Sequence, residues 1–398
     1  MPKKNTIKQI FKEHYQSFKQ WALTNSYSSL RQTVDDNIEK IIYCKDPKKL
    51  GFHQYSCPNH PDNKTIIPHT CKSRSCTSCG SLATNRWADS INDSFPNKPY
   101  FHITFTLPPL ISHFFAFKRK LFRLLFKATA DTMLSWFWEK HKVTPAISTV
   151  IHTFGRQLNW HVHIHMIISA GGFVPSKGIR SIDSSQDYSW KNIEFIPYKM
   201  IAKRFRYLLT SSLTSELLDA RYSQKVIDVL HETNWYTHCS GKLDKTIVTI
   251  GYIGRYTKRP PIAESKVLDY DGEFVTFRFT ETRSKTDVID RCPVNQFIKR
   301  FVQHIPEKHQ KYIMHYGLMA NRCKTFYQRQ LFSLGLLFDK TKARLSEMKY
   351  RLRKMIERGF DPMVCEKCGA EMILDAVVVK VSNGLTVKFI RSNQVSLE

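Results

Sequence analysis

An apolar run at residues 160–168, with histidine at every second position near its start, is the strongest constraint on how this chain folds. Side chains alternate between the two faces of a β-strand, so His161, His163 and His165 would share one face and the hydrophobic residues the other. A lone histidine on an apolar strand is usually a core residue. Three in alternation favour a metal site or a phosphate contact. We therefore predict a metal site or a phosphate contact on this strand, with His161, His163 and His165 as the candidate residues.

The sequence around this strand predicts a sheet built from hairpins. A β-rich run at 145–154 precedes it across the short connector 155–159, which is typical of a hairpin. In that hairpin His152 could lie opposite His163 and supply a further ligand, as could Gln157. Hydrophobic periodicity predicts one further strand at 100–107 and helices at 5–24, 111–139, 197–219, 223–233 and 247–258. The dipeptide Asp271-Gly272 predicts another hairpin.

The charge of the chain points to a polyanionic partner. Lys and Arg number 61 against 34 Asp and Glu, a formal net charge of +27, and the basic residues are spread along the chain. The neutralisation of phosphates by Lys and Arg dominates nucleic-acid affinity, so this balance favours a DNA or RNA partner. The alternative is a basic surface that is only solvated. No acidic residue occurs between Glu139 and Asp183, which suits an anionic phosphate near the histidines.

The hydrophobic content excludes a membrane protein. No apolar stretch is long enough to span a bilayer, and the first residues lack the features of a secretory signal. We therefore expect a cytoplasmic, nucleoid-associated protein with no membrane partner.

Cysteines cluster between residues 44 and 80, in a segment too poor in apolar residues to build its own core. Two close pairs separated by a loop are how a chain delivers four ligands to a tetrahedral zinc ion. We predict structural zinc bound by Cys57, His60, Cys76 and Cys79. The possible additional or alternative ligands are Cys44, Cys71 and His69.

A second pair, Cys365 and Cys368, precedes two β-rich runs at 376–381 and 386–390. Two ligands cannot complete a zinc site, so the pair is either part of a second knuckle or a redox pair. The candidate partners for a knuckle are His304, His309, His315 and Cys323.

Two tyrosines, Tyr252 and Tyr256, are spaced to share one face of the expected helix at 247–258. The spacing alone is common, and the glycines at 251 and 254 are unusual in a helix interior. The basic residues crowded around the pair are Arg255, Lys258 and Arg259. A phenol has a pKa near 10, so it needs nearby positive charge or a metal to act as a nucleophile at neutral pH.

In combination these features resemble the HUH two-tyrosine rolling-circle transposases of bacterial insertion sequences, the insertion sequence ninety-one family. His163-Ile-His165 matches the His-hydrophobe-His signature, and FHITFTL at 101–107 resembles the strand motif that precedes it. The tyrosine pair in YIGRYTKRPPIAES and the knuckle ending CKSRSCTSCG are also similar to that family. His60 departs from the family pattern, which usually has cysteine at this position. The resemblance covers residues 40–330.

The resemblance implies an α+β fold: an HUH-type palm with a central antiparallel sheet flanked by helices, an N-terminal zinc-binding module, and a mostly helical, basic C-terminal region with a small Cys knuckle. We expect 1–95 to form the N-terminal helices and zinc module, 96–285 the catalytic domain, 286–358 a helical DNA-binding region, and 359–398 the knuckle and β tail.

The resemblance also implies a reaction on single-stranded DNA at transposon ends and target. His163 and His165 would hold Mg²⁺ or Mn²⁺, with His161 as a third ligand or a substrate contact. Tyr252 or Tyr256 would attack the scissile phosphate. The products would be a 5′-phosphotyrosine and a free 3′-hydroxyl, with the second tyrosine serving a second transfer. Arg156, Arg255, Lys258 and Arg259 would contact the DNA.

Three other functions fit parts of the pattern. A plasmid-type rolling-circle replication initiator would use the same chemistry. A zinc-bearing DNA-binding protein would use none of it, and its histidine triplet would be structural. A zinc hydrolase would activate water at the histidines and cleave without a covalent adduct.

Overall fold

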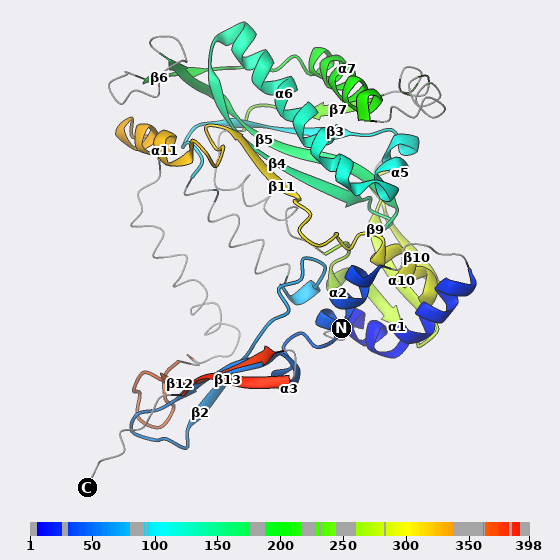
Figure 1. The fold of residues 1–398 in the computed structure, drawn as a ribbon, viewed down its shortest axis with the longest axis vertical. Helices are drawn as coiled ribbons and strands as arrows, with labels where there is room; N and C mark the ends of the chain where they lie inside the picture. Colours follow the sequence, from blue (N-terminus) through cyan, green and yellow to red (C-terminus); the bar gives the residue numbers. More distant parts are fainter. Residues whose placement is uncertain are drawn as a thin grey trace.

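Three antiparallel sheets organise the computed structural model (Figure 1). It describes residues 6–25, 31–79, 94–175, 188–216, 235–243, 260–281, 284–337, 363–381 and 384–390, with the single residues 91, 228, 230, 233 and 361. The mixture of antiparallel sheets and separate helices is the α+β class that the sequence predicts.

The largest sheet has six strands and contains the histidine-rich strand near its centre. Its order is β11-β4-β5-β3-β7, and β6 pairs with the far end of β5. The β4–β5 hairpin and the strand at 100–107 are confirmed. The strands are β3 (Tyr100–Thr106), β4 (Thr144–Phe154), β5 (Trp160–Pro175), β6 (Tyr188–Asn192), β7 (Tyr236–Cys239) and β11 (Ile313–Gly317).

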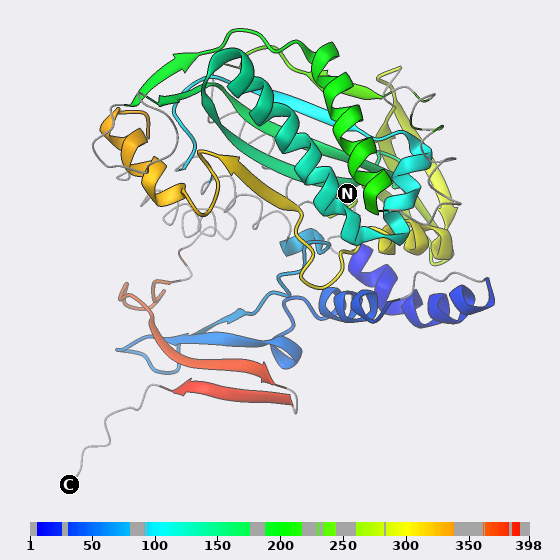
Figure 2. The ribbon, with the colours of Figure 1, turned by 45° about the horizontal axis from the view of Figure 1, so that its top comes forward.

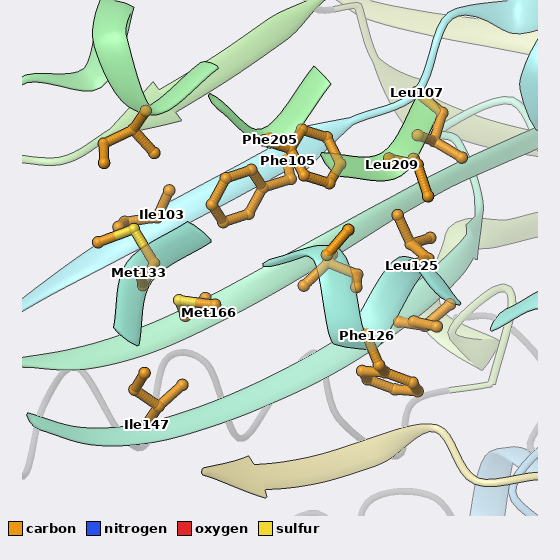
Figure 3. Close-up of a cluster of buried hydrophobic side chains, with 14 of the residues drawn as sticks. Ile103, Phe105, Leu107, Leu125, Phe126, Met133, Ile147, Met166, Phe205 and Leu209 are labelled. Carbon is orange, nitrogen blue, oxygen red and sulfur yellow. The ribbon is translucent and has the colours of Figure 1, made fainter. Parts of the chain in front are cut away.

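Helices cover one face of this sheet, as Figure 2 shows. They are α5 (Pro109–Phe117), α6 (Phe122–His141) and α7 (Tyr198–Glu216). Every second residue of the strands packs into the core beneath them, where Phe105 meets Phe205 with ring centroids 4.8 Å apart (Figure 3). The opposite face carries the histidines and other polar residues of the alternation, together with a separate apolar cluster that includes Val150, Ile167 and Phe173.

The helix expected at 111–139 is interrupted. Lys118 has a non-helical backbone, and a short 3-10 turn, η1 (Arg119–Leu121), follows it. The interruption turns the Arg119 guanidinium toward the carbonyl oxygens of Gln303 and Ile305, and it lies over the Trp160 ring. These contacts tie the loop to a second core.

That second core packs the N-terminal helices α1 (Thr6–Thr24) and α2 (Gln32–Ile42) against a small sheet, β10-β9-β8, and against the helix that follows it, α10 (Val294–Val302). Phe11 of α1 packs against Phe301 of α10 with ring centroids 5.0 Å apart, and the Ile7 N–H donates to Glu264 across 3.0 Å. The expected boundary between 96–285 and 286–358 is therefore wrong, because the hydrophobic faces of this small sheet and of α10 are buried against the N-terminal helices. The elements are α1 (Thr6–Thr24), α2 (Gln32–Ile42), η2 (Glu264–Lys266), β8 (Val267–Tyr270), β9 (Phe274–Thr280), β10 (Asp287–Pro293) and α10 (Val294–Val302).

The third sheet joins the two ends of the chain. Its order is β13-β12-β1-β2, and Phe52 of β1 lies opposite Val378 of β12. Figure 1 shows the red C-terminal strands lying beside the blue N-terminal ones. The segment expected as a separate tail at 359–398 thus belongs with the N-terminal module. The elements are α3 (Pro47–Leu50), β1 (Gly51–Ser56), β2 (Lys64–Pro68), β12 (Ile373–Val381) and β13 (Gly384–Ile390).

In the region expected to be helical after residue 286, the residues that the structure describes form two helices and two strands. Residues 313–317 form β11, which pairs with β4 at the edge of the large sheet. The prediction of a helix is therefore wrong for residues 313–317. The helix α11 (Lys324–Ser333) follows this strand. Among the helices that the structure describes, none combines the length and apolar character needed to cross a membrane.

Candidate active site

The histidines of β5 form one face of the strand, as the alternation predicts. His161, His163 and His165 are half-buried on the face away from the helices, while Val162 and Ile164 are fully buried in the helical core. Neighbouring imidazoles along the strand have ring centroids 4.9 and 5.1 Å apart. The strand therefore presents a row of imidazoles beneath a packed sheet.

His152 completes this row from the neighbouring strand. It lies directly opposite His163 in the β4–β5 register and is 2% exposed. One ligand nitrogen from each of His152, His163 and His165 lies within 4.8 Å of the others. This spacing can hold a metal ion on three imidazoles.

His161, predicted as the third ligand, is not part of this group of three among the described residues. Residues on one face of a strand are about 6.6 Å apart, whereas directly opposed residues on paired strands approach to about 5 Å. His161 therefore lies beyond His163, away from His165. Gln157, the other candidate, is exposed at the tip of the hairpin.

Burial keeps the imidazoles of His163 and His165 neutral. It lowers the pKa of His163 to about 4 and, with the neighbouring imidazole of His152, lowers that of His165 well below its usual value. Metal ligation requires the neutral form of histidine. The donor set therefore fits a divalent ion at neutral pH without prior deprotonation.

His102 of β3 extends the site, and the sequence reading missed it. Its Nε2 lies 2.9 Å from Nδ1 of His165, and Thr104 Oγ1 lies 3.3 Å from the same nitrogen. Burial, followed by the neighbouring His238, lowers the pKa of His102 to about 4. The signal was available, because His102 and Thr104 share the period-two alternation of a strand that the sequence does predict.

The expected nucleophiles lie outside the described residues. Tyr252 and Tyr256, with Arg255, Lys258 and Arg259, fall in the segment 244–259, which the structure does not describe. The segment begins after Leu243, whose backbone pairs with Tyr100 at the start of β3. Arg156, the remaining expected DNA contact, is exposed on the β4–β5 hairpin and donates to the Thr280 carbonyl across 2.9 Å.

The four residues predicted for one zinc ion are divided between two clusters. Cys76 and Cys79 lie with Cys44 and Cys71, where Sγ atoms approach to 3.5 Å. Cys57 and His60 lie instead with Cys365 and Cys368. The prediction was wrong because β2 lies between the two pairs: Cys57 and His60 are in the turn before this strand, whereas Cys76 and Cys79 follow it. The guessed partners of Cys365 and Cys368 belong to neither cluster.

The first cluster also positions a partly buried arginine. Arg74 lies between Cys71 and Cys76 in the chain, and its guanidinium lies 4.2 Å from the centroid of the Tyr312 ring. Its Nη2 donates to the carbonyl of Ile151, the residue before His152, across 3.4 Å. A cation from the cysteine-rich segment thus contacts the strand that carries the third imidazole.

A cationic cavity of about 1410 Å³ lies beside the β4–β5 hairpin. Eight Lys and Arg side chains line it against two Glu, together with aromatic rings that include Trp160. Trp160 starts β5 and faces the helical side, whereas the next residue, His161, faces the imidazole side. The basic residues are Arg31, Lys118, Arg119, Lys120, Arg123, Arg300, Lys308 and Lys311.

Known proteins resemble this chain along nearly all its length. Residues 147–326 match the family described as putative transposase, and residues 10–107 match the transposase zinc-binding domain. The chain is 30% identical over 391 residues to the transposase for insertion sequence element IS801 of Pseudomonas savastanoi pv. phaseolicola, covering 94% of this chain and 90% of the relative. It is 24% identical over 404 residues to the putative transposase y4qJ of Sinorhizobium fredii, covering 96% of each. No solved structure matches it.

Proposed function

Since this chain belongs to the IS91 family of insertion-sequence transposases, we propose that it nicks and rejoins single-stranded DNA by metal-assisted tyrosine transesterification. The observation that carries this proposal is the convergence of three imidazoles on one sheet face. Such a site suits phosphate chemistry, and a +27 chain suits a DNA substrate. As a DNA-acting enzyme the protein would work at the nucleoid.

His152, His163 and His165 would hold the divalent ion. A bound Mg²⁺ or Mn²⁺ would polarise the scissile phosphate and stabilise charge on its oxygens. We favour Mn²⁺, because imidazole suits manganese better than magnesium, which prefers oxygen ligands. His102 would hold His165 in place through their hydrogen bond.

Tyr252 and Tyr256 would be the nucleophiles. The phenol oxygen of one attacks phosphorus, the bond from phosphorus to the 3′-oxygen breaks, and the leaving 3′-oxygen takes a proton. The phosphotyrosine retains the energy of the broken bond, so the second transfer needs no ATP. Arg255, Lys258 and Arg259 would lower the phenol pKa and bind phosphate.

The cationic cavity would hold the DNA backbone next to this site. Lysine and arginine walls neutralise phosphates, and the aromatic rings offer faces on which unpaired bases stack. Arg156 on the same hairpin would add a contact at its tip. Trp160 and His161 are consecutive residues on opposite faces of β5, so DNA held in the cavity would reach the imidazoles around the start of this strand.

A covalent-adduct assay tests the proposal. The full-length protein is incubated with single-stranded oligonucleotide and Mn²⁺, and the expected product is a DNA–protein adduct that survives denaturation. The Tyr252→Phe, Tyr256→Phe double variant should lose it. Its matched control is Tyr198→Phe, Tyr207→Phe, two exposed phenols on α7, which should retain it.

The other outcomes identify the rival functions. Cleavage without an adduct would indicate hydrolysis by an activated water, and DNA binding without cleavage would indicate a non-catalytic protein. An adduct that releases closed single-stranded circles from a plasmid origin, but does not join transposon ends to a target, would indicate a replication initiator.

A further inference from the structure

A second Cys/His cluster brings together residues from the two ends of the chain. Cys57 and His60 lie in the turn between β1 and β2, and Cys365 and Cys368 lie in the turn before β12. His60 Nδ1 is 3.8 Å from the Sγ atoms of both Cys57 and Cys365, and the Cys57 and Cys368 sulfurs are 3.5 Å apart. One ligand atom from each residue lies within 4.8 Å of the others.

These distances fit four ligands around one ion. Ligands about 2.3 Å from a tetrahedral zinc lie about 3.8 Å from one another. A disulfide would bring two sulfurs to about 2.05 Å, whereas the Cys57 and Cys368 sulfurs are 3.5 Å apart and every cysteine is a free thiol. The geometry therefore favours a metal site over the redox pair that the sequence left open.

Backbone and amide N–H groups support the sulfurs. The N–H groups of Lys367 and Cys368 donate to Cys365, and those of Asn59 and His60 donate to Cys57. Such donors stabilise thiolates, the form in which cysteine binds a metal. Both turns thus hold their first cysteine in the same way.

Side chains and backbone conformation complete the two turns. The Asn63 amide donates to Cys365 across 3.1 Å, so a residue of one turn contacts a ligand of the other. Gly369 has a φ of +72°, which a side chain would disfavour, and its N–H closes the second turn on the Cys365 carbonyl. The two turns therefore position the sulfur atoms as well as connecting the strands.

We propose that Cys57, His60, Cys365 and Cys368 bind a structural zinc ion, distinct from the one held by Cys44, Cys71, Cys76 and Cys79. With β1, β2, β12 and β13 it forms a zinc ribbon whose two turns come from opposite ends of the chain. The matched zinc-binding domain, residues 10–107, contains only half of these ligands. The ribbon is thus incomplete until the C-terminal turn docks.

Metal content tests this proposal without reference to DNA cleavage. The full-length protein should contain two zinc ions per chain by mass spectrometry of the metal. The Cys365→Ser, Cys368→Ser variant should contain one, and so should Cys76→Ser, Cys79→Ser. The matched control, Cys239→Ser, Cys323→Ser, replaces two partly buried thiols outside both clusters and should keep two. One zinc in the wild type, or two in the Cys365→Ser, Cys368→Ser variant, would overturn the proposal.

A conservative variant covers the case in which the serine variants fail to fold. His60→Cys preserves four ligands and should keep two metal ions. In protein loaded with Co²⁺, its thiolate charge-transfer absorption should rise by about one seventh, from seven thiolates to eight across the two sites. An unchanged spectrum with full loading would show that residue 60 is not a ligand.

Discussion

His102 Nε2 and His165 Nδ1 lie 2.9 Å apart and share a hydrogen bond between adjacent strands. When His165 donates through Nδ1, its Nε2 lone pair is free for a metal, so His102 selects the tautomer that can bind. The two rings are also stacked, with centroids 5.1 Å apart. A residue that need not touch the ion would thus orient a proposed metal ligand.

Replacing His102 should weaken metal binding. His102→Phe keeps a ring but removes the hydrogen bond, and we expect Mn²⁺ affinity and the nicking rate at subsaturating Mn²⁺ to fall about 10–100-fold. Mn²⁺ titration followed by electron paramagnetic resonance measures the affinity. The control is His141→Phe, at the end of α6 on the helical face. Equal Mn²⁺ affinity in the two variants would rule out a positioning role.

His152 and His161 should differ sharply when each is changed to alanine. His152→Ala removes one of three converging ligands, so Mn²⁺ affinity should fall more than about 100-fold. His161→Ala leaves the three intact and should reduce it less than about tenfold. Isothermal titration of both variants with Mn²⁺ measures the difference. A larger loss in His161→Ala would restore the ligand set that the sequence suggested.

Neutralising the exposed lysines of the cationic cavity should weaken DNA binding in a salt-dependent way. The triple variant Lys120→Ala, Lys308→Ala, Lys311→Ala should lower affinity for single-stranded DNA and reduce the slope of log affinity against log salt by about 2, or roughly 0.7 per lost contact. Fluorescence anisotropy at several salt concentrations measures this slope. Lys12→Ala, Lys127→Ala, Lys140→Ala removes the same charge elsewhere on the surface. Identical slopes in the two triples would mean that the cavity has no special role.

A glycine at the edge of the large sheet should resist substitution. Gly317 of β11 has a φ of +58°, and a Cβ there would lie 1.9 Å from the Pro145 carbonyl oxygen. Gly317→Ala should therefore lower the free energy of unfolding by about 2–4 kcal/mol. At Gly241 a Cβ meets nothing within 4 Å, so Gly241→Ala should change it by less than about 0.5 kcal/mol. Urea denaturation of both variants provides the comparison, and similar midpoints would contradict the steric argument.

The sequence predicted those parts of the fold that local periodicity encodes. The alternation around His163 gave a strand with a polar and an apolar face, and the short connector before it gave the β4–β5 hairpin. That hairpin placed His152 opposite His163, as its length suggested. Asp271-Gly272 likewise predicted the β8–β9 hairpin. Each of these features depends on residues fewer than about twenty positions apart.

Long-range pairings were not predictable from the same patterns. Strand β11 has five residues, all partly buried, so it shows no clear alternation. The sequence prediction grouped the zinc ligands by their closeness along the chain. In the structure Cys57 shares a cluster with Cys365, because β1 pairs with β12 and brings the two turns together. Nothing in either local segment specifies which distant strand it will meet.

The β1–β12 pairing also sets an order of assembly. A ribosome adding about 5–20 residues per second reaches Cys365 roughly 15–60 s after Cys57, so the nascent chain must hold β1 without its partner for that interval. During translation an unpaired strand edge and two unused ligands can also accept the end of another polypeptide. Exchange of C-terminal arms between chains made on one messenger RNA is therefore the characteristic misassembly of this architecture, and it would give dimers that contain their full complement of zinc.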